Sequence, residues 1–199
     1  MVKPVFLKAC QLRFEKPTPE VVISHTKTRL SYDIVSAILE AALRLLPPDR
    51  TADGTLRRQE KAAKKAQRAA DAEFAFVDLL LSVDKELLRE EEQKEQIRAL
   101  VERGTLEIVR STPDVRFSRE TSVCGITCRW LEYKNTFGFR SSPFVAAKDK
   151  KQFAKYASTF GPGMVVYKLG YERNHIQIEG VHCFREKEVV DWLRLLNRE

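Results

Sequence analysis

The stretch that decides the fold is residues 112–134, TPDVRFSRETSVCGITCRWLEYK. Residues 115–119 and 123–134 have the composition and alternation of strands, so the stretch predicts a β-hairpin. Successive strand side chains point to opposite faces, so Glu132 and Lys134 share a face with apolar residues of the same strand. This pattern predicts two ionic groups at the rim of a covered sheet. The alternative is an exposed strand end that carries a simple ion pair.

Asp114 lies at the start of the first of these strands, and seventeen residues separate it from Glu132. An antiparallel hairpin of that length brings the two carboxylates side by side. Two converging carboxylates suit Mg²⁺ or Mn²⁺, with waters and a substrate phosphate completing the coordination. Lys134 can then orient the attacking water or stabilise charge on the phosphate. The residues thus predict metal-assisted hydrolysis of a phosphodiester bond.

Further elements are expected on both sides of the hairpin. After it, residues 148–160 predict a helix, MVVYKL and HIQIEGVHCF predict two strands, and residues 185–197 predict a closing helix. Before it, the expected elements are a strand over 2–14, helices over 20–29 and 32–46, a linker over 47–54, a long helix from Leu56 broken near Ser82, and a strand over 105–110. This order predicts an α/β sandwich with a mixed sheet.

Four cations of the long helix repeat at helical spacing and share one side of it. We call this set the basic edge; it comprises Arg57, Lys61, Lys64 and Arg68. The net charge of +7 favours a polyanionic partner such as nucleic acid. The basic edge is therefore either a phosphate-contacting surface or a solvated helix face.

Glu73 lies three, four and seven residues before Phe76, Val77 and Leu80, on or beside the apolar stripe of the long helix. A carboxylate on a buried stripe is costly unless it has a partner or a metal. The alternative is that Glu73 is a residue at the boundary of the stripe.

The composition excludes several classes of protein. With 199 residues, 43% of them hydrophobic and 32% charged, the chain is globular, with room for one domain and an appendage. No stretch approaches the ~20 apolar residues of a membrane helix, so no membrane partner is expected. The four cysteines and three histidines show no zinc or disulfide pattern, and no secretory signal is visible. We expect an intracellular protein, in the nucleus or cytoplasm rather than in an organelle.

Pro113-Asp114, followed by Glu132-Tyr133-Lys134, resembles the signature of the PD-(D/E)XK nuclease superfamily. The surrounding motifs resemble its TPD-domain branch over roughly residues 70–184: Thr112-Pro113-Asp114, the run from Trp130 to Lys134 followed by Phe137-Gly138, and the run from Phe160 to Tyr167. The resemblance implies a restriction-endonuclease-like core and a Mg²⁺-dependent nuclease acting on DNA or RNA.

The resemblance also implies roles for individual residues. Asp114 and Glu132 would bind the metal, Glu73 would bind the metal or hold one of its waters, and Lys134 would position the nucleophile. Gln152 and Tyr156 fit the QxxxY motif of related nucleases, and, one helical turn apart, both could face the site and the nucleic acid.

The linker and the resemblance together predict three parts. These are residues 1–50, in which residues 20–46 suit a remnant of a helix-turn-helix; a basic helical linker over 51–70; and a nuclease domain over 71–199. Two rival functions stay open. One is a catalytically inactive nuclease fold that serves as a scaffold or binds nucleic acid in a larger assembly with a protein partner. The other is a helical adaptor that acts through residues 31–100.

Overall fold

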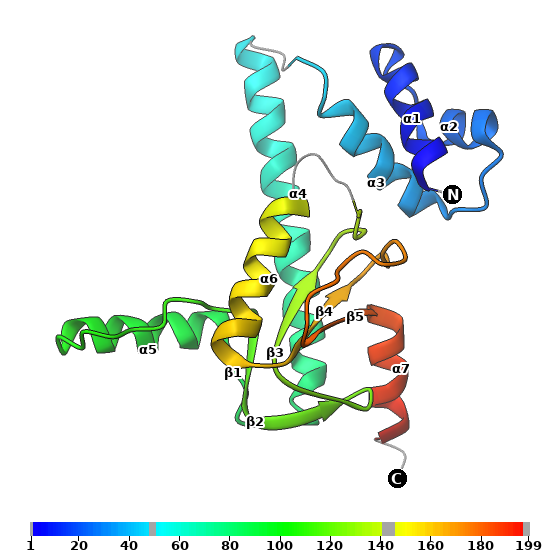
Figure 1. The fold of residues 1–199 in the computed structure, drawn as a ribbon. Coiled ribbons are helices and arrows are strands. Elements are labelled where there is room, and N and C mark those ends of the chain that lie inside the picture. Colours follow the sequence, from blue (N-terminus) through cyan, green and yellow to red (C-terminus); the bar gives the residue numbers. More distant parts are fainter. Residues whose placement is uncertain (1, 48–50, 141–145, 197–199) are drawn as a thin grey trace. The chain divides into compact units, whose positions relative to one another are not determined.

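The computed structural model describes residues 2–47, 51–140 and 146–196. The chain divides into two compact units, Met1–Ala69 and Ala70–Glu199 (Figure 1). The division falls inside the long helix α4 (Ala52–Leu80). No helix in the described ranges combines the length and apolar character needed to cross a membrane.

The first unit is helical. It contains α1 (Val2–Leu12), the 3₁₀ turn η1 (Arg13–Glu15), α2 (Pro19–Thr26), α3 (Tyr32–Leu43) and the first part of α4. The helices expected over 20–29 and from Tyr32 are confirmed. The linker expected over 47–54 lies partly outside the described residues, at 48–50, and α4 begins at Ala52 rather than at Leu56.

The strand expected over residues 2–14 is wrong, because this segment forms α1 and η1. Val5, Ala9 and Leu12 are buried at spacings of four and three residues, which matches one face of a helix. Pro4 lies in the first turn, where a missing N–H costs no helical hydrogen bond.

The second unit is a mixed five-stranded sheet with helices, as expected. Its elements are the last part of α4, β1 (Leu88–Arg89), α5 (Glu90–Glu102), β2 (Val115–Val123), β3 (Ile126–Lys134), α6 (Ala146–Phe160), β4 (Gly163–Tyr167), β5 (Val181–Arg185) and α7 (Glu186–Leu196). The strands lie in the order β1-β2-β3-β4-β5. Neighbours pair antiparallel as far as β3, and β3, β4 and β5 pair parallel.

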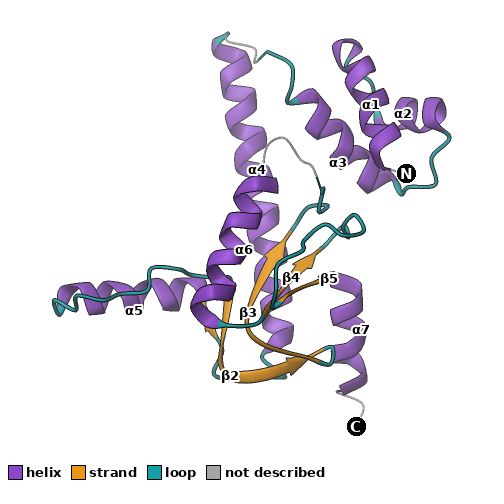
Figure 2. Cartoon of the chain, in the orientation of Figure 1, coloured by secondary structure: helices purple, strands orange, loops and turns teal. Residues whose placement is uncertain are grey.

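Helices cover both faces of this sheet (Figure 2). On one face, the end of α4 and helix α7 pack against the strands in a core that includes Phe76, Leu131 and Val189. On the other face, α6 packs against Trp130 and Val165. Alternate residues of β3 and β4 therefore enter different cores, and β3 is covered on both sides.

The expected hairpin forms, but residues 120–122, left between the two expected strands, belong to β2, and a two-residue turn joins β2 to β3. Cys124 and Gly125 form this turn with φ of 54° and 74°, the left-handed backbone that such tight hairpins require. The expectation that Cys124 belongs to a strand is wrong for that reason. The ladder also shifts register between Arg116 and Thr121, which lets the hairpin bend.

Two other strand predictions are corrected. Residues 105–110 form no strand, because β1 occupies the edge of the sheet beside β2. Leu106, in this segment, is 99% exposed. Within HIQIEGVHCF, only the part from Val181 onward is a strand, while His175 is buried in the preceding loop. The acidic run at residues 90–96 begins α5, and Gln93 is buried within it.

Candidate active site

The register of the hairpin brings Asp114 and Glu132 together. Val115 pairs with Leu131, so Asp114, just before β2, faces Glu132 on β3. The Asp114 backbone N–H donates to Glu132 Oε2 at 3.3 Å, and the Tyr133 backbone N–H donates to Asp114 Oδ2 at 2.7 Å. Backbone amides thus hold the two carboxylates in place.

Lys134 and Gln152 converge on the same glutamate. Glu132 Oε1 accepts hydrogen bonds from Lys134 Nζ at 2.7 Å and from Gln152 Nε2 at 3.0 Å. The ammonium group of Lys134 also lies 5.6 Å from the centre of the Phe153 ring. Glu132 is only 3% exposed, so the alternative of an exposed strand end with a simple ion pair is wrong.

Tyr156 connects helix α6 to the Thr112-Pro113-Asp114 segment. Gln152 Nε2 lies 2.8 Å from the Tyr156 hydroxyl, which donates to the Thr112 carbonyl at 3.1 Å. The structure therefore places both residues of the QxxxY motif in the cluster. Tyr156 is buried, with its hydroxyl engaged by the protein, so it positions the segment that carries Asp114. Its contact with nucleic acid stays a prediction.

Glu73 is half-buried on α4, one helical turn before Phe76. The Phe76 ring stacks on Tyr133 with centroids 4.9 Å apart, which anchors this part of α4 to β3. Burial, with the neighbouring charges of Glu90 and Glu132, raises the pKa of Glu73. Among the described residues, no three His, Cys, Asp or Glu side chains are close enough to chelate a metal by themselves. Asp114 and Glu132 thus form the core of the site, with Glu73 acting on it electrostatically.

The electrostatics of the cluster are those of crowded carboxylates. Burial, followed by the charges of Glu132 and Glu73, raises the pKa of Asp114 to about 8. Burial also raises the pKa of Glu132. Burial alone would lower the pKa of Lys134, but the charge of Glu132, the hydrogen bond to it, and the charges of Asp114 and Asp149 together outweigh burial and raise the pKa. One buried cation is therefore shared among several acids, so the site favours further positive charge.

Sequence reasoning assigned no role in the site to three residues that support the cluster. Gln93, 2% exposed, donates through Nε2 to the Leu88 carbonyl at 3.0 Å and to the Pro113 carbonyl at 2.9 Å. Thr112 Oγ1 donates to Glu90 Oε1 at 3.3 Å. These contacts fix the backbone immediately before Asp114. The available signal was the four-residue spacing of Gln93 and Ile97, which marks one face of a helix.

The structure does not add the basic edge to this cluster. Its four residues are exposed and belong to the first unit, whereas the cluster belongs to the second. Its role in binding nucleic acid stays a prediction.

Residues 60–187, which include the whole carboxylate cluster, match the model of a family described as "Protein of unknown function TPD sequence-motif". The chain belongs to the TPD family. It is similar to proteins named CDAN1-interacting nuclease 1. The Xenopus laevis protein is 32% identical over 107 residues, which is 53% of this chain and 33% of the relative. The Gallus gallus protein is 35% identical over 79 residues, 40% of this chain and 26% of the relative.

The Homo sapiens relative is 33% identical over 79 residues, which is 40% of this chain and 25% of the relative. This TPD protein thus aligns with about a third or less of the length of these three relatives. No solved structure matches the chain.

Proposed function

We propose that this TPD protein is a divalent-metal-dependent nuclease with a PD-(D/E)XK core. The observation that carries the proposal is the buried pair Asp114 and Glu132, with Lys134 bonded to the same glutamate. The antiparallel β2–β3 hairpin, followed by α6 and the parallel strand β4, supports this core. The nuclease names of the relatives support the same reaction class.

The donor set fits Mg²⁺, with Mn²⁺ as the alternative. Mg²⁺ is usually held by one or two carboxylates, and waters and substrate phosphates complete its octahedron. Within the described residues, the Asp114 carboxylate accepts one hydrogen bond, through Oδ2, so Oδ1 is available as a ligand. Asp114 and Glu132 would hold the ion, and Glu73 would hold one of its waters. When bound, the ion supplies Lewis acidity that polarises the phosphate and acidifies a water.

The residues of the chain have separable roles. Lys134 keeps its proton at neutral pH because the charge of Glu132 raises its pKa, so it offsets negative charge on the phosphate rather than acting as a base. Gln152 shares Glu132 Oε1 with Lys134 and thereby orients the glutamate. Tyr156 holds the Thr112 carbonyl, which keeps Asp114 in place just before the start of β2.

We propose two kinds of partner: nucleic acid as the substrate, and a protein. The names of the relatives describe nucleases that interact with CDAN1, and the matched segment overlaps the proposed nuclease core. A protein partner of this chain would therefore dock on the second unit or on a segment next to it.

The test is Mg²⁺-dependent cleavage of labelled DNA and RNA oligonucleotides by the parent, Glu132→Gln and Lys134→Ala. Both variants should lose activity about a hundredfold or more, as expected when a group that stabilises transition-state charge is removed. By calorimetry, Glu132→Gln should also bind Mg²⁺ more weakly, while Lys134→Ala should still bind it. The matched controls Glu95→Gln and Lys151→Ala change exposed residues and should cleave like the parent.

Two results would contradict the proposal. Cleavage at the parent rate by either folded variant would place the chemistry elsewhere. A parent that binds Mg²⁺ but cleaves no substrate would instead support the inactive scaffold.

A further inference from the structure

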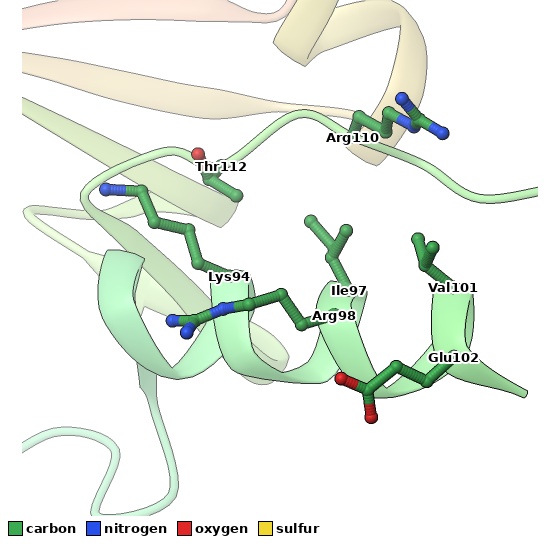
Figure 3. A pocket seen from close by; sticks show the side chains of 7 residues that line it. All are labelled: Lys94, Ile97, Arg98, Val101, Glu102, Arg110 and Thr112. Carbon is green, nitrogen blue, oxygen red and sulfur yellow. The ribbon is translucent and has the colours of Figure 1, made fainter.

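A pocket of about 710 Å³ lies between helix α5 and the irregular segment that precedes β2 (Figure 3). In Figure 3, Ile97 and Val101 point from α5 toward the segment that carries Arg110 and Thr112. The lining consists of Lys94, Ile97, Arg98, Val101, Glu102, Arg110 and Thr112. The pocket therefore combines an apolar floor with charged walls.

Positive charge dominates this lining, with three cations against one acid. Lys94 forms ion pairs with Glu90 at 2.8 Å and with Glu91 at 3.0 Å. Arg98 and Arg110 are exposed, and neither forms an ion pair with any residue that the structure describes. Two guanidinium groups are thus available for an anionic ligand, and guanidinium geometry suits phosphate oxygens.

One end of the pocket adjoins the carboxylate cluster. Thr112 lines the pocket, donates to Glu90, and accepts the hydrogen bond of Tyr156 on its carbonyl. It lies two residues before Asp114. A nucleic-acid strand bound in the pocket could therefore continue directly to the proposed site of cleavage.

We propose that this pocket holds an unpaired nucleotide of the substrate strand, next to the bond that is cut. Arg98 and Arg110 bind its phosphates, and the base lies against Ile97 and Val101. The inference rests on the proposed nuclease function and names its substrate class: nucleic acid with a single-stranded segment beside the cleaved bond.

Two physical reasons favour an unpaired nucleotide. The faces of duplex bases are covered by stacking, so an apolar floor can reach a base only in a single strand or a splayed end. The volume also falls in the range of roughly 300–1,000 Å³ that is typical of small-ligand sites, enough for a nucleotide and too small for a duplex. The carboxylates of an acidic peptide would pair with the two arginines, but such a peptide has no flat apolar group to cover Ile97 and Val101.

The test measures binding in EDTA by fluorescence anisotropy, so that it does not depend on cleavage. The probes are a labelled single-stranded DNA oligonucleotide, its abasic counterpart and a blunt duplex. The parent should bind the single strand more tightly than the other two. The double variant Arg98→Gln/Arg110→Gln should bind the single strand at least tenfold more weakly at 50 mM salt. Its log–log salt slope should be shallower by about 1.4, or ~0.7 for each phosphate that is no longer neutralised.

Two single variants test the charged walls and the apolar floor of the pocket separately. Arg103→Gln removes an exposed cation of the same region that does not line the pocket, so it should change affinity less than twofold. Val101→Ser should weaken binding of the normal single strand but not of the abasic one. The proposal is overturned if the double variant binds like the parent with an unchanged slope. It is also overturned if the parent binds the abasic strand equally well, or if polyglutamate competes as well as the oligonucleotide.

Cleavage by the same variants distinguishes failure of the pocket from failure of the nuclease. If the parent cleaves and the double variant has the same KM, the pocket assignment is wrong while the nuclease stands. If the parent cleaves nothing but binds the single strand through Arg98 and Arg110, the nuclease is wrong while the pocket stands.

Discussion

Replacing Asp114 with asparagine is expected to stabilise the metal-free protein. Asparagine has nearly the same shape, and its carbonyl oxygen can accept the Tyr133 backbone N–H that Asp114 accepts at 2.7 Å. The substitution removes a negative charge that burial and the neighbouring Glu132 and Glu73 make unfavourable. The variant therefore relieves electrostatic repulsion without creating a cavity.

The pKa of Asp114 sets the size and the sign of the effect. Its carboxyl has a pKa near 3.8 when unfolded and about 8 when folded, so the folded state binds the proton more tightly. Protonated Asp114 therefore makes its full contribution to the free energy of unfolding below pH ~4. This contribution falls as the pH rises to about 8 and stays constant above that. One whole proton corresponds to about 1.4 kcal/mol per pH unit.

Because Asp114 shares its charge interaction with Glu132, we expect about half that slope, or ~0.7 kcal/mol per pH unit. The advantage of Asp114→Asn should then reach about 3 kcal/mol at pH 8.5. That difference corresponds to a rise in Tm of roughly 6–12 °C.

The assay is urea denaturation followed by circular dichroism, in EDTA, from pH 5 to 8.5. The control Glu95→Gln changes an exposed acid on α5 and should follow the parent at every pH. Adding Mg²⁺ should stabilise the parent more than Asp114→Asn, because the variant lacks a ligand charge. The reasoning is refuted if the gap between variant and parent is the same at pH 5 and 8.5, or if the variant is the less stable protein at pH 8.5.

Three further predictions concern other parts of the chain. Neutralising all four residues of the basic edge should weaken duplex binding and reduce the salt slope by about 0.9 for each phosphate that is no longer neutralised; an unchanged slope would mark a solvated helix face. Gly163→Ala should lower the free energy of unfolding by about 1–3 kcal/mol in urea titrations, because its Cβ would lie 2.2 Å from the Trp130 ring; parent-like stability would contradict this packing. Burial lowers the pKa of His175 to about 4, so the parent should lose stability as the pH falls from 6.5 toward 4. His175→Gln should remove that part of the loss, and identical pH profiles for variant and parent would show that His175 does not titrate as buried.

Sequence by itself determined the β2–β3 hairpin and the face that carries the site. Strand alternation alone places Glu132 and Lys134 on one face of β3. In the structure, Lys134 Nζ lies 2.7 Å from Glu132 Oε1. The sequence also predicted that the hairpin brings Asp114 beside Glu132, but the exact pairing depends on the register shift between Arg116 and Thr121, which the sequence did not indicate. The four-residue spacing of Gln152 and Tyr156 puts both on one side of α6. The strand alternation and the helical spacing depend on residues near each other in the chain, so local periodicity suffices to predict these two features.

Only the tertiary structure decided which segment occupies the edge of the sheet, and what supports Asp114. Residues 105–110 have the composition of a strand, yet the two residues of β1 pair with β2 instead. That choice is a competition between segments for one set of backbone partners, and no local pattern encodes its outcome. The same pairing brings α5 beside Pro113, where Gln93 and Glu90 hold the segment next to Asp114. In sequence these two residues lie in an acidic run, and only long-range packing makes them part of the site.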